Sequence, residues 1–250
     1  MSDIFQIASI GMLQGRQRLE AISLNAASAS LPGYRRHISV GRPFDSALAA
    51  PAAATAGAPA AAGSPAAVTR PAVTGVDLRQ GAMTQTHRAL DVAIEGDDLF
   101  FALTDGTQTW LTRAGTFHVG ETGFLEGERG LHVVSGEGDI RLPGGEVQVA
   151  SDGRITSQGA VVATLQLFRP NERSALQAAS GSLLAAPGGI QPAEAGVGRV
   201  RSGMLEASNT DSAREMLGVV EISRQFESLS RVIQGYDELL GRVIEKLGEV

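Results

Sequence analysis

The stretch DSAREMLGVVEISRQFESLSRVIQGYDELLGRVIEKLG, residues 211–248, decides the fold class. Asp211 or Ser212 can cap the start of a helix, and Glu215 stands three residues after Ser212 as a capping-box partner. Apolar residues then recur with gaps of three and four in strict alternation, which is the a/d spacing of a coiled coil. These seam residues are Val219, Ile222, Phe226, Leu229, Ile233, Tyr236, Leu240, Val243 and Leu247.

The first 30 residues predict a second helix with the same alternating gaps but smaller side chains. Its seam is Phe5, Ala8, Met12, Gly15, Leu19, Ile22, Ala26 and Ala29. Leu31-Pro32-Gly33 should end it, because Pro32 disfavours helical geometry in the residue before it. Since each helix alone is marginal in water, we expect the two to pack together. We also expect both ends to be partly disordered in the free monomer and to order on assembly.

The region between these helices reads as a linker followed by β structure. Residues 49–67 are almost wholly Ala, Pro, Gly, Ser and Thr, which indicates an extended linker. Short apolar alternations follow, separated by turn signals at Asp105-Gly106, Thr122-Gly123, Gly144-Gly145 and Asp152-Gly153. The sequence therefore predicts an α+β fold, with a central all-β domain flanked by N- and C-terminal coiled-coil-type helices that pack together. The expected segments are 1–44, the linker 45–71, the β-rich domain 72–205 and 206–250.

Composition excludes several function classes. The net charge of −6 and the pI near 5.3 argue against a nucleic-acid binder, which needs a basic face to neutralise phosphates. The absence of cysteine removes disulfides, thiolate nucleophiles and zinc–cysteine sites. Asp3 precedes the first apolar stretch without a preceding Lys or Arg, so no ordinary cleaved secretion signal is expected. No apolar run reaches the ~20 residues of a membrane span, and we expect no membrane insertion.

No constellation of polar residues predicts an enzyme, a cofactor or a metal site. The histidines at 37, 87, 118 and 132 have no recognised ligand spacing. Asp97-Asp98 stands just before an apolar stretch and predicts a turn rather than an acid–base pair. Asp91 lies in an apparent strand and needs a cationic partner, for which Arg88 and Arg113 are the candidates.

Several motifs resemble those of the bacterial flagellar axial proteins, the family of rod, hook and hook-associated subunits. Asn25 to Arg35 resembles that family's N-terminal pattern ending in Gly-Tyr-Arg, although Ser28 and Leu31 depart from it. Gln80 to Thr86 followed by Leu90 to Gly96 resembles one central motif, and Trp110 to Phe117 resembles a second with one residue added. Gly203-Met204-Leu205-Glu206-Ala207-Ser208-Asn209-Thr210 resembles the motif before the last helix. Together these motifs cover nearly all of the chain outside the Ala/Pro-rich linker.

The resemblance implies a structural role. Terminal helices of the family pack into a tubular core, the β domain faces outward, and subunits leave the cell through the flagellar type III export apparatus without signal cleavage. The implied partners are other rod subunits and further copies of this chain, in a basal-body rod that spans the periplasm and serves motility. The implied assembly residues are the seam residues Phe5, Met12, Leu19, Ile22, Val219, Ile222, Phe226, Leu229, Ile233, Tyr236, Leu240, Val243 and Leu247, with the motif residues Asn25, Gly33, Tyr34, Leu205, Glu206, Ser208 and Asn209.

Within the family, the chain most resembles the proximal rod subunits. Arg224-Gln225-Phe226-Glu227 and the ending from Asp237 to Gly248 favour them over distal rod subunits, which tend to have Gln-Arg-Ala-Tyr at that place. The distal rod subunit is the alternative. A surface adhesin with a coiled-coil stalk is a more remote alternative.

Overall fold

The computed structural model describes residues 2–40, 73–136, 138–145, 147–194 and 197–248. The linker predicted at 45–71 lies outside these ranges. The chain divides into two compact units. We call residues 1–23, 38–74 and 213–250 the helical unit, and residues 24–37 and 75–212 the β unit.

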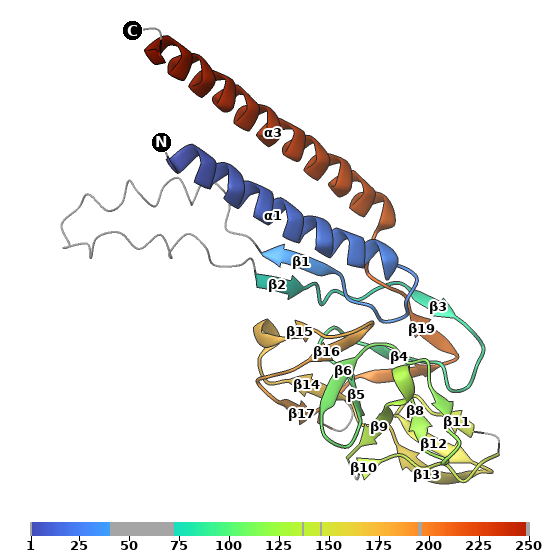
Figure 1. Cartoon of the computed structure of the whole chain (residues 1–250). Coiled ribbons are helices and arrows are strands. Elements are labelled where there is room, and N and C mark those ends of the chain that lie inside the picture. Colours follow the sequence, from blue (N-terminus) through green and yellow to red (C-terminus); the bar gives the residue numbers. More distant parts are fainter. Residues whose placement is uncertain (1, 41–72, 137, 146, 195–196, 249–250) are drawn as a thin grey trace. The chain divides into compact units, whose positions relative to one another are not determined.

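Two long helices are described, one near each end of the chain (Figure 1). Helix α3 spans Ser212–Gly248, and it begins where Asp211 and Ser212 were expected to cap it. Helix α1 spans Ser2–Ala27 and ends three residues short of the predicted boundary at 30. Residues 28–30 form turns instead, with the Leu31 amide bonded to the Ser28 carbonyl, because the chain must leave the helical path before Pro32. Neither helix is both long and apolar enough for a membrane span over the residues described.

Nineteen short strands occur in the rest of the described chain, with turns and loops between them. They are β1 His37–Val40, β2 Val73–Val76, β3 Met83–Gln85, β4 Val92–Glu95, β5 Phe101–Thr104, β6 Thr109–Thr112, β7 His118–Val119, β8 Leu125–Glu126, β9 His132–Ser135, β10 Gly138–Asp139, β11 Val147–Val149, β12 Arg154–Ser157, β13 Ala160–Thr164, β14 Phe168–Pro170, β15 Gln177–Ala178, β16 Leu183–Ala185, β17 Ile190–Pro192, β18 Arg199–Ser202 and β19 Met204–Glu206. Two 3-10 turns, η3 Glu128–Gly130 and η4 Arg173–Ala175, lie among them. The fold class is therefore α+β, as predicted.

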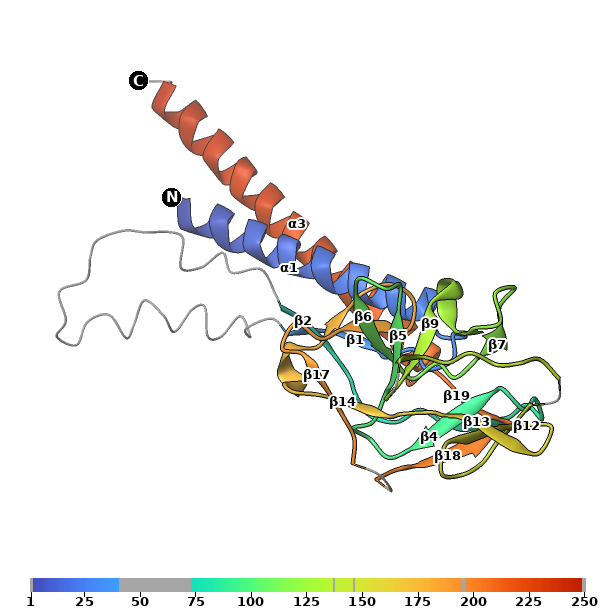
Figure 2. The same ribbon diagram turned by 90° about the horizontal axis from the view of Figure 1, so that it is seen from below.

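The strands pair almost wholly in antiparallel fashion. The largest sheet has the order β15-β16-β6-β5-β9-β8-β7, with β10 added beside β9. Strands β11, β12 and β13 form a separate meander. Strand β4 pairs with β18 (Figure 2). Strand β19 pairs with β3, which joins the end of the β unit to its beginning. The predicted turn at Asp105-Gly106 closes the β5–β6 hairpin, where the Asp105 carboxylate accepts hydrogen bonds from the Thr107 and Gln108 amides.

The core of the β unit lies on both sides of β5. Phe101 and Leu103 face one apolar cluster, and Phe100 and Ala102 face another. All four are fully buried, as expected for a strand covered on both faces. Phe101 also packs edge-to-face on Phe117, with ring centroids 5.0 Å apart. Each such side chain stabilises the fold by about 1.5–3 kcal/mol through burial, so the β unit has a core of its own.

Candidate functional site

The most elaborate site in the β unit is built around Glu206, at the end of β19. Its Oε1 accepts a hydrogen bond from Arg35 Nη1 at 2.6 Å, and its Oε2 accepts one from Arg113 Nη1 at 3.1 Å. All three side chains are buried, with exposed fractions of 1% or less. The Glu206 Oε1 also accepts the Gly81 amide at 2.8 Å. One carboxylate thus joins four segments that lie far apart in the sequence, and we call Arg35, Arg113 and Glu206 the Arg–Glu–Arg cluster.

Gly33 brings the chain into this cluster at very short range. Its amide donates to the Glu206 carbonyl at 2.7 Å, and its φ of +67° lies in the left-handed region. A Cβ at this position would lie 2.1 Å from the amide nitrogen of Ala114. The backbone approach therefore requires glycine, which explains the Gly33-Tyr34-Arg35 order: the turn at Gly33 delivers Arg35 to Glu206.

The electrostatics of the cluster depend on Glu206. Two guanidinium groups share one carboxylate, so the three side chains carry a net positive charge in a buried place. Burial lowers the pKa of Arg113 to about 10, partly opposed by the Glu206 carboxylate. Arg113 also donates to the carbonyls of Ile94 and Gly96, and its guanidinium lies 5.2 Å from the centroid of the Phe100 ring. Removing one partner from such a buried ionic group costs about 3–5 kcal/mol.

Asn25 fixes the chain that leaves α1. Its Nδ2 donates to the His37 carbonyl at 2.9 Å, and its Oδ1 accepts the His37 amide at 2.8 Å. The Tyr34 hydroxyl donates to the same Oδ1 at 3.2 Å, and the Tyr34 ring stacks on the His37 ring. Burial lowers the pKa of His37, because the charged imidazolium is less well solvated there. These contacts close the segment 25–37 into a loop whose side chains are internally bonded.

Asn209 performs a similar role just before α3. Its Oδ1 accepts the Arg36 amide at 2.7 Å, and its Nδ2 donates to the carbonyls of Asp77 and Arg79. The Asp77 carboxylate accepts from Arg79, and this bond holds the pKa of Asp77 below its ordinary value. Asn209 therefore ties the segment that enters α3 to the segments at 36 and 77–79.

Two other predicted motif residues lie beside this network. Leu205 is half-buried and pairs with Thr84 across β19 and β3. Ser208 accepts the Thr210 amide with its Oγ at 3.1 Å, which shapes the turn before α3. The structure thus brings Asn25, Gly33, Tyr34, Glu206 and Asn209 together in one polar network, with Leu205 and Ser208 on its border.

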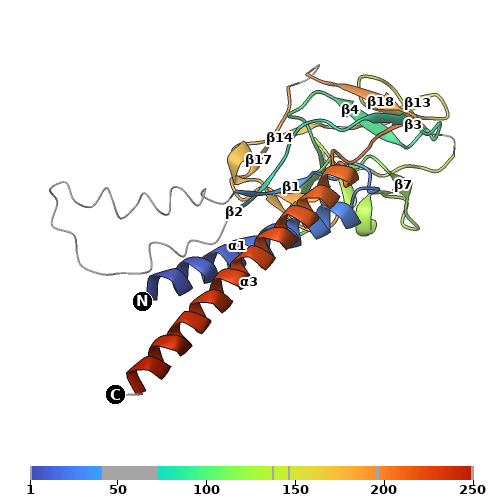
Figure 3. The same cartoon turned by 90° about the horizontal axis from the view of Figure 1, so that it is seen from above.

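The second candidate site is the antiparallel contact between α1 and α3 in the helical unit (Figures 1 and 3). A Cβ placed on Gly11 would lie 3.3 Å from Leu229, and one on Gly15 would lie 3.1 Å from Phe226. Ile22 reaches the helix backbone at Gly218, where a Cβ would lie 2.8 Å from Ile22 Cδ1. Each large apolar residue therefore packs against a glycine of the opposite helix. Arg18 and Glu221 add an exposed ion pair at 3.6 Å, which contributes little.

The predicted seam is covered unevenly. Ile222 is buried, with an exposed fraction of 1%, and Ile22 is buried as well. Met12, Leu19, Phe226, Leu229, Ile233 and Tyr236 are half-buried, whereas Val219 is 36% exposed. The side chains of Phe5, Leu240, Val243 and Leu247 lie outside the described part of the structure. Helix α3 has 37 residues against 26 in α1, and it continues past the end of its partner (Figure 3).

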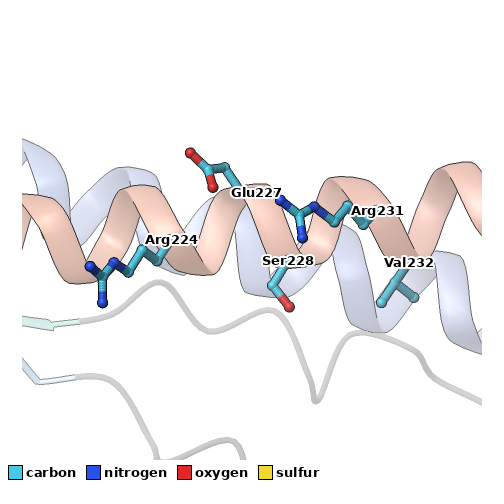
Figure 4. Close-up of a pocket in the computed structure, with 5 residues that line it drawn as sticks. All are labelled: Arg224, Glu227, Ser228, Arg231 and Val232. Carbon is cyan, nitrogen blue, oxygen red and sulfur yellow. The ribbon is translucent and has the colours of Figure 1, made fainter.

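The opposite side of α3 is polar along its middle. Arg224, Glu227, Ser228 and Arg231 project from the helix at intervals of three and four residues, followed by Val232 (Figure 4). No group of three His, Asp or Glu side chains that could hold a metal ion occurs among the residues described. His132 instead pairs with Asp139, and His118 lies 3.6 Å from Glu126.

Sequence reasoning named the residues of the network but missed their main contact. Of the two partners predicted for Asp91, Arg88 is the one found, at 3.8 Å, while Arg113 pairs with Glu206. In the sequence, Arg35 is notable only as part of the Gly33-Tyr34-Arg35 motif. The sequence contains one signal for this contact. Arg35, Arg113 and Glu206 are charged residues inside three of the motifs, and charged side chains that become buried need partners of opposite charge.

Comparisons with known proteins identify relatives over most of the chain. A family model described as flagellar basal body rod FlgEFG protein C-terminal matches residues 201–246. The flagellar basal-body rod protein FlgF of Caulobacter vibrioides is 33% identical over 185 residues, covering 71% of this chain and 74% of the relative. FlgF of Salmonella typhimurium is 32% identical and covers 89% of each chain. The flagellar basal-body rod protein FlgG of Bacillus subtilis is 28% identical, covering 94% of this chain and 95% of the relative.

Proposed function

The chain belongs to the flagellar basal-body rod proteins, and from that premise we propose that it is a subunit of the proximal segment of the rod. Its class of function is structural: it is a rod subunit that assembles with other rod subunits and not an enzyme. The proximal assignment is supported by FlgF relatives at 32–33% identity, which we equate with the proximal rod. The distal rod is the second candidate, because a FlgG protein aligns over nearly the whole chain.

Assembly through the terminal helices is the proposed mechanism. The contact between α1 and α3 carries this proposal, because glycines on each helix receive large apolar side chains of the other. We propose that this contact continues as a coiled-coil-type seam through Ile233, Tyr236, Leu240, Val243 and Leu247. Since α1 is shorter than α3, the last part of the seam would be completed by helices of neighbouring subunits.

The other predicted segments have separate proposed roles in the assembled subunit. We propose that residues 72–205 form the outer domain and that 45–71 serve as a linker. The segments 1–44 and 206–250 would supply the axial contacts. The subunit would reach the rod through the flagellar type III export apparatus with α1 retained, because the proposed seam needs both helices.

Quantitative mass spectrometry of purified hook–basal bodies tests the assignment. A few copies per basal body, retained after hook and filament are stripped, would support the proximal rod. Tens of copies would move the assignment to the distal rod. Absence of the chain from intact basal bodies would contradict the rod proposal for either segment. Loss of the extracytoplasmic protein when the export ATPase is deleted would support the export route, and unchanged export would contradict it.

A further inference from the structure

A pocket of about 310 Å³ opens on the surface of the β unit, and every residue that lines it belongs to that unit. Its apolar lining includes Leu31, Pro32 and Ala114. Leu31 is 39% exposed, although it is a large apolar residue. The polar lining includes Glu128 from η3 and Ser182 from the turn before β16. The pocket therefore combines an apolar lining with a single carboxylate.

Glu128 is held in a fixed position within this pocket. Its Oε2 accepts hydrogen bonds from the Ser182 amide at 3.1 Å and from the Ser182 hydroxyl at 2.5 Å. Gly181 leaves room for the carboxylate, because a Cβ at that position would lie 1.9 Å from Glu128 Oε1. The next residue in η3, Arg129, has a φ of +62°, which is strained for a residue other than glycine. The surrounding chain therefore orients the Glu128 carboxylate before a partner binds.

The Glu128 carboxylate has no counter-charge in the described part of the chain. Both of its hydrogen bonds go to Oε2, and no cationic side chain among the described residues forms an ion pair with it. His118 lines the same pocket but lies 3.6 Å from Glu126 instead. The remaining oxygen, Oε1, can accept a charge-assisted hydrogen bond. A long cationic side chain fits both parts of the pocket, because its aliphatic stem can lie along Leu31 and Pro32.

Arg169, in the middle of β14, is an exposed arginine that suits this pocket. All but one of the 21 basic residues of the chain are arginine. Several exposed arginines of the β unit already pair with a carboxylate, among them Arg154, Arg173 and Arg201. Arg169 has no such partner among the described residues, and the residue opposite it on β17 is the neutral Gln191. Strand β14 also lies apart from β7, whose first residue lines the pocket (Figures 2 and 3). Arg169 is therefore available to another molecule.

We propose that the pocket binds the Arg169 side chain of a neighbouring copy of this chain in the rod. The guanidinium bonds to Glu128, and the stem of the arginine packs against Leu31 and Pro32. This inference rests on the proposed function and adds a contact between the β units of two copies, separate from the terminal helices. The pocket and the arginine are different surfaces of one chain, so the contact is heterologous. Such a contact repeats from copy to copy and builds a ring or a helical array rather than a closed dimer.

Paired cysteines test the contact directly, because the chain has no cysteine of its own. The variant His118→Cys/Gln191→Cys places one thiol at the pocket and one opposite Arg169. In purified basal bodies, a short bis-maleimide should join positions 118 and 191 of different copies and produce a ladder of dimers and larger multimers. The control variant His118→Cys/Val161→Cys, with its second thiol at an exposed position of β13, should give at least tenfold less.

The outcomes of this cross-linking separate the possible occupants of the pocket. A ladder no stronger than that of the control would overturn the proposal. A link from position 118 to a different rod subunit, identified by mass spectrometry, would also overturn it, because the occupant would not be a second copy. Absence of both the variant and the wild type from basal bodies would instead contradict the proposed function.

Removal of either charge tests the ion pair in the same paired-cysteine background. Glu128→Gln keeps an acceptor for Ser182 but loses the charge, and Arg169→Met keeps an unbranched stem without the guanidinium. Each should lower the ladder yield at least fivefold while leaving the denaturation midpoint of the free chain, followed by Trp110 fluorescence, unchanged. The matched control is Arg199→Met, at an exposed position of β18, which should leave the yield unchanged. Full yield in Glu128→Gln and Arg169→Met, or an equal loss in Arg199→Met, would overturn the pairing of Arg169 with Glu128.

Discussion

The Arg–Glu–Arg cluster and the α1–α3 contact differ in how far one chain alone buries and pairs their side chains. In the cluster, each charged side chain finds its partner within the chain, and Glu206 is bonded by Arg35, Arg113 and the Gly81 amide. In the helix pair, apolar residues such as Met216 and Val219 remain exposed within the chain. The carboxylate of the cluster is therefore bonded within one chain, whereas we expect assembly to cover the apolar side chains that the helix pair leaves exposed.

The largest expected effect comes from the cluster. Glu206→Ala leaves two buried guanidinium groups without a counter-charge, and it should lower the free energy of unfolding of the β unit by about 3–5 kcal/mol. Urea denaturation followed by the fluorescence of the single tryptophan, Trp110, measures this change.

Glu95→Gln is the matched control for that experiment. Glu95 pairs with Arg201 across β4 and β18, but its side chain is 34% exposed. The control should change stability by less than about 1 kcal/mol. Equal losses in Glu206→Ala and Glu95→Gln would show that the cluster is no more than a surface ion pair in its energetic effect.

The contact between α1 and α3 is tested by a charge substitution in the seam of α3. Ile233→Asp places a charge in the seam, at a cost of several kcal/mol once the site is dry. It should abolish rod assembly and motility but leave the Trp110-reported unfolding of the β unit unchanged. Gln234→Asp, at an exposed position of the same helix, should assemble normally. Normal motility in Ile233→Asp would contradict the seam.

Substitution of Gly33, at the turn that leads to Arg35, should lower the free energy of unfolding by less than loss of Glu206 does. Gly33→Ala forces a Cβ against the Ala114 amide at a φ of +67°, and we expect a loss of about 2–3 kcal/mol in unfolding free energy. Gly106→Ala tests the backbone conformation alone, because Gly106 has a φ of +90° and no atom within 4 Å of an added Cβ. The control should cost about 1 kcal/mol. Comparable losses in the two variants would show that the approach of Gly33 to Ala114 is not tight.

The smallest effect is a pH dependence that belongs to His37. Because its pKa is lowered in the folded state, the folded protein binds fewer protons than the unfolded chain below pH 6.5. The stabilisation that His37 gives in its neutral form is complete above pH 6.5 and declines as the pH falls below that value. His37→Gln should flatten the stability profile between pH 7 and 5 relative to wild type. Superimposable stability profiles of His37→Gln and wild type would show that His37 does not contribute to the pH dependence.

The sequence predicted local structure better than tertiary partnership. The turn at Asp105-Gly106 and the start of α3 near Ser212 depend on neighbouring residues, so local chemistry was enough. The partner of Glu206 was missed because Arg35 lies 171 residues away, and nothing local distinguishes it from Arg36. The alternating gaps on α1 pointed to Met12, yet Gly11 is the residue that faces Leu229. A straight helix with 3.6 residues per turn drifts away from a 3.5-residue pattern, and the small side chains let α3 approach on the glycine side.

Hydrogen–deuterium exchange, measured on the free chain and on purified basal bodies, tests the contrast between the two regions most directly. We predict strong protection of the amides of Gly33 and Gly81 in both states, because Glu206 holds them within the monomer. Amides of α1 and α3 should exchange at least tenfold more slowly in basal bodies than in the free chain. Equal protection of both helices in the two states would contradict the account, since the helix pair would then be complete without assembly.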